Sequence, residues 1–180
     1  MKTSLYKRNH HEKKEKNMKK YAGLFVVGLV VLGLAGVGVA QTTAQHNVTV
    51  DVQAITCIAM TGGGDLTINI TTATPGSEPD AVQNSSRGLQ WTTNETAQKV
   101  TVAADVAYST YTLKALATGI VGGGSAAAEV TFNDANDHDF VTGVATEVGS
   151  CTIRYTASAT AAAGVGSEQH QITYTITDAT

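Results

Sequence analysis

A short acidic segment is the best candidate in this sequence for a site that does chemistry. Carboxylates and an amide gather there, as Asp134, Asn136, Asp137 and Asp139. Side-chain oxygens of this kind are the ligands that Ca²⁺ prefers. The segment lacks the glycine and the distal glutamate of an EF-hand loop. Two interpretations stay open, a calcium site and a solvated turn whose side chains cap their own backbone.

Residue patterns typical of enzymes do not accompany this segment. His46, His138 and His170 are far apart in the sequence, whereas a metal site or a general base requires partners at hydrogen-bond distance. The serines lie outside any Gly-x-Ser-x-Gly elbow, and the glycine triplets lack the Lys-Ser/Thr of a phosphate-binding loop. We therefore expect a protein that is not an enzyme, with no catalytic residues and no cofactor apart from the calcium ion considered above.

The acidic segment lies downstream of an N-terminal leader. Residues 21–40 carry no charge, follow Met18-Lys19-Lys20 and end in small residues at Ala40. A basic start, an apolar stretch and a small-residue exit are typical of a secretory signal peptide. We expect residues 1–40 to be a signal helix that is cleaved, with residues 1–17 a polar prelude and Met18 the true start. The alternative is an uncleaved leader that anchors the chain, because the apolar run approaches the length of a membrane span.

The two cysteines also bear on the export of the chain. An exported chain meets an oxidising compartment, where a single pair of cysteines is expected to bridge. We therefore predict a Cys57–Cys151 disulfide, which on the chain-entropy account would contribute roughly 4 kcal/mol to the free energy of unfolding. The alternative is two separate buried thiols.

Charge is distributed unevenly between the leader and the remainder. Of the 12 Lys and Arg and the 15 Asp and Glu residues, 8 and 2 fall within residues 1–40, which leaves a net charge of −9 on residues 41–180. A surface this poor in cations repels phosphate backbones and anionic lipids. We expect no nucleic-acid partner and no membrane association after cleavage, with the protein secreted to the cell surface, the extracellular space or the periplasm.

Residues 41–180 are rich in threonine and other β-branched residues, which favour strands over helices. Apolar and polar residues alternate in short runs separated by glycine turns, as in Leu89 to Val102 and in the pair of runs 151–157 and 172–177, both of which we expect to form hairpins. Eight or nine such strands predict a single all-β domain, an antiparallel β-sandwich of immunoglobulin-like or pilin-like type.

The first strand of this domain is expected over residues 46–60. Val48, Val50 and Val52 share one face of it, and the polar residues between them share the other. This strand can close its own sheet, or it can pair with the sheet edge of a neighbouring subunit, since unpaired edge groups accept an added strand. Trp91 is interpreted as a core residue, with an exposed sugar-stacking platform as the alternative.

The leader, the Val48–Val52 strand and the final runs Cys-Thr-Ile-Arg-Tyr-Thr-Ala and Ile-Thr-Tyr-Thr-Ile-Thr resemble small secreted bacterial surface and fimbrial-type β-sandwich subunits. The resemblance implies a structural protein that polymerises with itself by strand exchange into a cell-surface filament. Chaperone–usher pilins differ in having an early cysteine pair and a penultimate tyrosine. The alternative function is a monomeric secreted binding module, an adhesin or carbohydrate-binding domain for a glycan or protein ligand, using Trp91, the 74–86 loop or the acidic segment.

Overall fold

The computed structural model describes residues 43–179. The predicted signal peptide, residues 1–40, and the expected start at Met18 lie outside the described residues. The chain divides into one unit that ends at Val50 and a second, compact unit from Asp51 onward. Within the described part of the chain, no helix has the length and apolarity that a membrane crossing requires.

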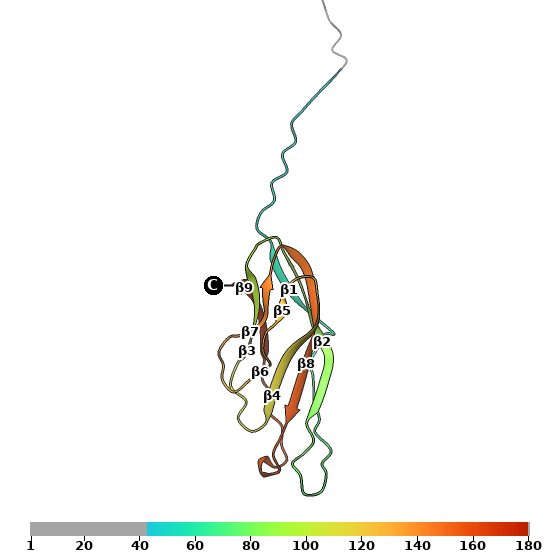
Figure 1. Cartoon of the computed structure of the whole chain (residues 1–180), viewed down its shortest axis with the longest axis vertical. Helices are drawn as coiled ribbons and strands as arrows, with labels where there is room; N and C mark the ends of the chain where they lie inside the picture. The colour runs from blue at the N-terminus through green and yellow to red at the C-terminus, as the bar shows by residue number, and fades with distance from the viewer. Residues whose placement is uncertain (1–42, 180) are drawn as a thin grey trace, which may run out of the picture. The chain divides into compact units, whose positions relative to one another are not determined.

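The compact unit is a two-layer, all-β sandwich, which confirms the predicted fold class (Figure 1). One sheet has five strands in the order β1-β2-β8-β4-β6, and the other has four in the order β5-β7-β3-β9. Every pair of neighbouring strands is antiparallel. The strands described are β1 (Thr56–Thr61), β2 (Val82–Thr93), β3 (Gln98–Ala104), β4 (Thr112–Val121), β5 (Ser125–Ala126), β6 (Val130–Thr131), β7 (His138–Val144), β8 (Glu147–Ser158) and β9 (Ile172–Asp178).

The core lies between the layers and is built from the alternating apolar residues of the central strands. Side chains on a strand point alternately to opposite faces, so alternate residues are buried along β3, through most of β8 and in the second half of β2. The largest side chains that are almost fully buried are Trp91, Phe132, Phe140, Leu89 and Ile153. Trp91 is 2% exposed, so it is a core residue, as expected, and not an exposed platform for a sugar.

Two expected hairpins are wrong. β2 and β3 are consecutive in the chain but belong to different sheets, and so are β8 and β9. Figure 1 shows β3 and β9 in the layer opposite β2 and β8. Alternation determines which side chains of a strand face the core, but two strands of opposite sheets satisfy it as well as two neighbours in one sheet. The connections therefore cross from one layer to the other.

The predicted Cys57–Cys151 disulfide is also wrong, because both cysteines are free. Cys57 on β1 lies opposite Thr92, whereas Cys151 on β8 lies opposite Leu89, three residues along and on the far side of β2. This places the two Cα atoms roughly 10 Å apart across the sheet and about as far along it. A disulfide needs Cα atoms within about 6.8 Å. Cys57 is moreover exposed, whereas Cys151 is buried in the core.

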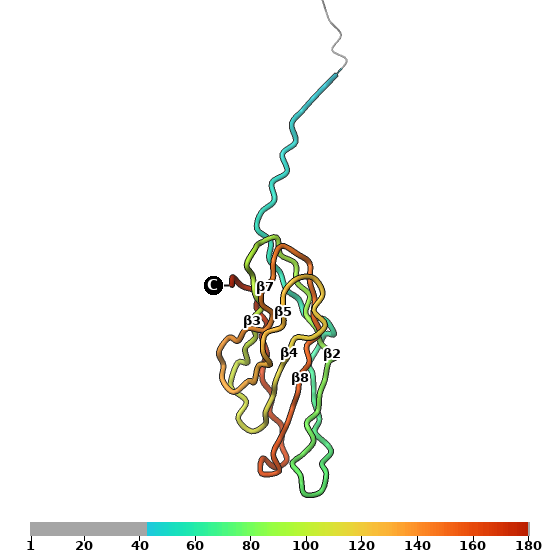
Figure 2. Tube along the Cα trace, viewed as in Figure 1, coloured from blue at the N-terminus to red at the C-terminus, as the bar shows by residue number. Residues whose placement is uncertain are grey.

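The first strand is shorter than the sequence predicts. Of the expected strand 46–60, only residues 56–60 join a ladder, as part of β1 (Thr56–Thr61), and residues 43–55 form no strand. Leu66 and Ile68 in the next segment, residues 65–71, pack against the core, yet this segment too joins no ladder. At the lower end of Figure 2, the loop that follows residue 71 lies beside the connection from β8 to β9. A hydrogen bond joins the two loops, because the N–H of Ala161 in the connection donates to a carboxylate oxygen of Glu78 in the loop.

Candidate functional site

The open edges of the two sheets are the first component of the candidate site. β1 and β6 end the five-stranded sheet, and β5 and β9 end the four-stranded sheet. β5 and β6 are two residues long, whereas β1 has six residues and β9 has seven. The neighbouring edges β1 and β9 are therefore the two that offer a substantial row of backbone groups to another strand.

The second component is the segment 46–54, which contains the predicted assembly residues. The side chains of Val48, Val50 and Val52 are 74%, 81% and 68% exposed. Three valines at alternate positions form an apolar face on an extended segment, and such a face gains free energy when another surface covers it. In the described structure that face is not buried, and its backbone joins no ladder.

Asn94, in the turn between β2 and β3, fixes the chain where this segment joins the sandwich. Its Oδ1 accepts from the backbone N–H of Ile55 at 2.7 Å, and its Nδ2 donates to the carbonyl of Gln53, also at 2.7 Å. Its own N–H donates to the carbonyl of Ile55 at 3.0 Å. These bonds hold residues 53–55 extended in line with β1. The sequence indicated only a turn at Asn94, because a contact across 39 residues leaves no local signal.

The inward face of β9 is incompletely covered. Ile172, Tyr174 and Ile176 point toward the core but stay half-buried, whereas the threonines between them are exposed. The hydroxyl of Tyr174 lies 2.9 Å from that of Tyr155 on β8, and its ring packs edge-on against Phe140 at 5.0 Å between centroids. Burial, together with the neighbouring Tyr155, raises the pKa of Tyr174 far above its ordinary value, so this tyrosine is a neutral link between the two sheets.

The predicted calcium ligands face different partners. Asp134 Oδ1 accepts from Asn136 N–H at 3.0 Å and lies 2.8 Å from Nε2 of His138, and these hydrogen bonds hold the pKa of Asp134 below its usual range. Asp139 forms an ion pair with Lys99 at 3.0 Å. In residues 43–179, no group of three or more His, Cys, Asp or Glu side chains is placed to hold a metal. Asp134 and Asn136 thus form a capped turn that leaves out Asp137, and calcium binding stays a prediction.

A carboxylate cluster that the sequence did not indicate surrounds His170. Its ring nitrogens lie 3.2 Å from Asp105 and 3.1 Å from Glu168. Glu168 also accepts the backbone N–H groups of residues 109, 110 and 111 at 2.9 to 3.1 Å. Burial alone would raise the pKa of Glu168, but these donors hold it at about 2. The cluster ties the loop before β4 to the loop before β9, a structural task.

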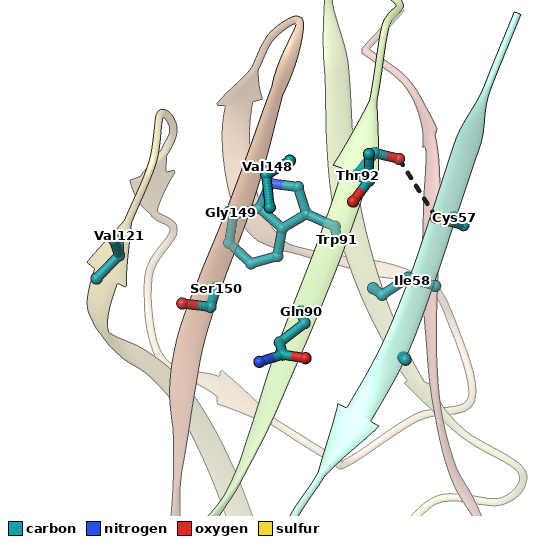
Figure 3. A pocket seen from close by; sticks show the side chains of 10 residues that line it. Cys57, Ile58, Gln90, Trp91, Thr92, Val121, Val148, Gly149 and Ser150 are labelled. Atoms are coloured by element: carbon teal, nitrogen blue, oxygen red, sulfur yellow. Dashed lines mark hydrogen bonds between the residues drawn. The ribbon is translucent and has the colours of Figure 1, made fainter.

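A shallow depression of about 450 Å³ lies on the outer face of the five-stranded sheet. Its lining includes exposed Val121 and Val148, the thiol-bearing Cys57 on β1, and Gln90 on the central strand β2 (Figure 3). Cys57 Sγ donates to the Thr92 carbonyl at 3.6 Å. The depression brings together no titratable group besides this thiol, so it offers apolar contact and no evident chemistry.

Comparison of the chain with protein-family models, with curated proteins and with solved structures finds no match. The fold defines the class of protein at the level of an all-β sandwich whose two longer edge strands are β1 and β9.

Proposed function

We propose that this protein is exported and serves as the structural subunit of a cell-surface filament or fimbria-like assembly. In this proposal, residues 46–54 of one copy add as a strand to an open sheet edge of the next copy. The observation that carries the proposal is the exposed, alternating row Val48, Val50 and Val52 on a segment with no strand partner in the described structure.

Physical chemistry supports this assignment in two ways. An extended segment gains main-chain hydrogen bonds when it joins an exposed sheet edge, and alternate apolar side chains then add burial on one face. Burying three valines would contribute on the order of 4–6 kcal/mol by area, before the entropic cost of ordering the segment. Sheet edges are normally protected by lysine or proline, and neither β1 nor β9 contains either residue.

The competing function is a monomeric binding module. Trp91, its sugar-stacking candidate, is buried in the core, which removes the aromatic surface that this alternative required. The acidic turn and the 74–86 loop remain as binding surfaces for it.

The test uses protein recovered from cells that express the full chain with its own leader. Replacing Val48, Val50 and Val52 together by serine should abolish the polymers seen by negative-stain microscopy, because the apolar face is lost. A matched variant with Thr49→Ser and Gln53→Ser, on the opposite face, should polymerise as before. Both variants should keep the circular dichroism of the unaltered protein. A protein that stays monomeric at high concentration without any substitution would contradict the proposal.

A further inference from the structure

We infer that the edge that receives residues 46–54 is β9 of a second copy of this chain, an inference that rests on the proposed function. Three inward residues of β9 are half-buried at alternate positions, in the same spacing as the three donor valines. On β1, by contrast, Ile58 is half-buried but Thr56 and Met60 in the same row are exposed, so that edge offers a single matching position.

A second copy fits this edge better than the chain's own segment. To lie beside its own β9, the segment would have to fold back immediately before β1. Asn94 holds residues 53–55 extended through three hydrogen bonds, and residues 46–54 contain no glycine or proline to reverse the chain. A donor from a second molecule requires no such reversal of the chain.

The hydrogen bonds of β9 show which residues face the open edge. Asp105 N–H donates to the carbonyl of Gln171, and Ala179 N–H donates to that of Ala97, both toward β3. In an antiparallel ladder, bonded and non-bonded pairs alternate, so odd-numbered residues of β9 bond β3 and even-numbered ones point outward. The backbone groups of Ile172, Tyr174 and Ile176 are therefore those that an added strand would bond.

A polar pair at the end of β9 favours an antiparallel register. With Val50 opposite Tyr174 in that direction, the remaining valines meet Ile172 and Ile176, and His46 lies opposite Asp178. The parallel register also matches the apolar residues, but it places Ala54 opposite Asp178. An imidazole N–H can donate a hydrogen bond to the Asp178 carboxylate, whereas the methyl side chain of Ala54 cannot. Polar cross-strand pairs of this kind stabilise a sheet, so the antiparallel register is favoured.

The same direction allows the contact to repeat. Gln98 donates to Asp178 at 2.6 Å and to Glu95 at 3.4 Å, and Thr56 donates to Glu95 at 3.2 Å. The start of β1 and the end of β9 therefore share one end of the sandwich. An antiparallel donor enters beside Asp178 and leaves beyond Ile172, where its own sandwich begins in the same orientation. A head-to-tail contact of this kind generates an open filament.

Engineered cysteines test the acceptor and the register in a Cys57→Ser background. Thr49 and Thr175 would form a non-hydrogen-bonded pair, in which side chains approach most closely. The variant with Thr49→Cys and Thr175→Cys should give a ladder of covalent multimers on non-reducing gels. The control carries Thr49→Cys and Thr173→Cys, the pair that the parallel register brings together. The yield of multimers should be at least tenfold higher for the first variant than for this control. Single-cysteine variants serve as controls for random oxidation.

The outcomes separate this inference from the proposed function. Suppose that polymers are seen by microscopy, but the cysteine at position 49 crosslinks to Thr173→Cys or to Ala59→Cys on β1. That result would overturn the inference about β9 and leave the proposed filament intact. Polymers in which none of these pairs links would do the same. Absence of both polymers and multimers would overturn the filament and the acceptor together.

Discussion

At the scale of single residues, Gly149 shows how a missing side chain creates room in the core. A Cβ atom at this position would lie 2.4 Å from Cε2 and Nε1 of Trp91, whose indole packs across β8 there (Figure 3). The sequence alone presents Gly149 as one of many glycines near turns. In the structure it lies within a strand, where the indole occupies the space that a side chain would take.

We predict that Gly149→Ala destabilises the fold by about 1–3 kcal/mol, because an over-packed core must displace the indole. Thermal unfolding measures the loss, and the emission of Trp91, the one tryptophan of the chain, should report the shift of its environment. Ser150→Ala, on the outer face, should change stability by no more than about 0.5 kcal/mol. Equal midpoints for the two variants would contradict the close packing of Trp91 on Gly149.

At the scale of elements, Glu168 joins the loops before β4 and β9. Its pKa in the folded protein is about 2, below the ordinary value of 4.5, so the ionised carboxylate favours the fold. This contribution is fully present above about pH 4.5 and is lost as the pH falls toward 2. The same loops position β9, the edge on which the inferred assembly depends.

Replacing Glu168 by Gln should therefore cost about 1–3 kcal/mol at neutral pH, since hydrogen bonds to a charged acceptor are lost. The unaltered protein should lose stability between pH 4.5 and 2 more steeply than this variant, as measured by urea unfolding across that range. Glu129→Gln, which removes a surface carboxylate near Lys114, is the matched control and should change stability by about 1 kcal/mol or less. Parallel acid profiles for the variant and the unaltered protein would refute the assignment.

At the scale of the whole molecule, the sandwich is held together without a covalent crosslink. Cys151 is buried, and this burial raises the pKa of its thiol to about 11, whereas Cys57 is exposed on β1. The inference that the protein is exported now depends on the leader, because the predicted bridge no longer supports it. The net charge of −9 on residues 41–180 favours solubility through mutual repulsion between copies.

A thiol-reactive probe should modify one cysteine of the native protein rapidly and the second only after unfolding, because the thiolate is the reactive form and Cys151 is shielded. A reducing agent should leave the unfolding midpoint unchanged. Replacing Cys57 by Ser should remove the rapid phase and preserve the fold. If neither cysteine reacted with the probe until a reductant was added, the protein would contain a disulfide, and this result would contradict the structure.

The alternation of Val, Ile and Thr determined by itself that the chain forms antiparallel strands with one buried face, because the two-residue period of a strand is a local property. It also predicted the core position of Trp91 and, in the N-terminal segment, the apolar row Val48, Val50 and Val52. Only the tertiary structure decided that β2 and β3 lie in opposite sheets, that Cys57 and Cys151 lie on opposite faces, and that the ladder begins at Thr56. These features depend on contacts between residues far apart in the chain, such as Asn94 with Ile55, and a local period carries no information about which distant strand becomes the partner.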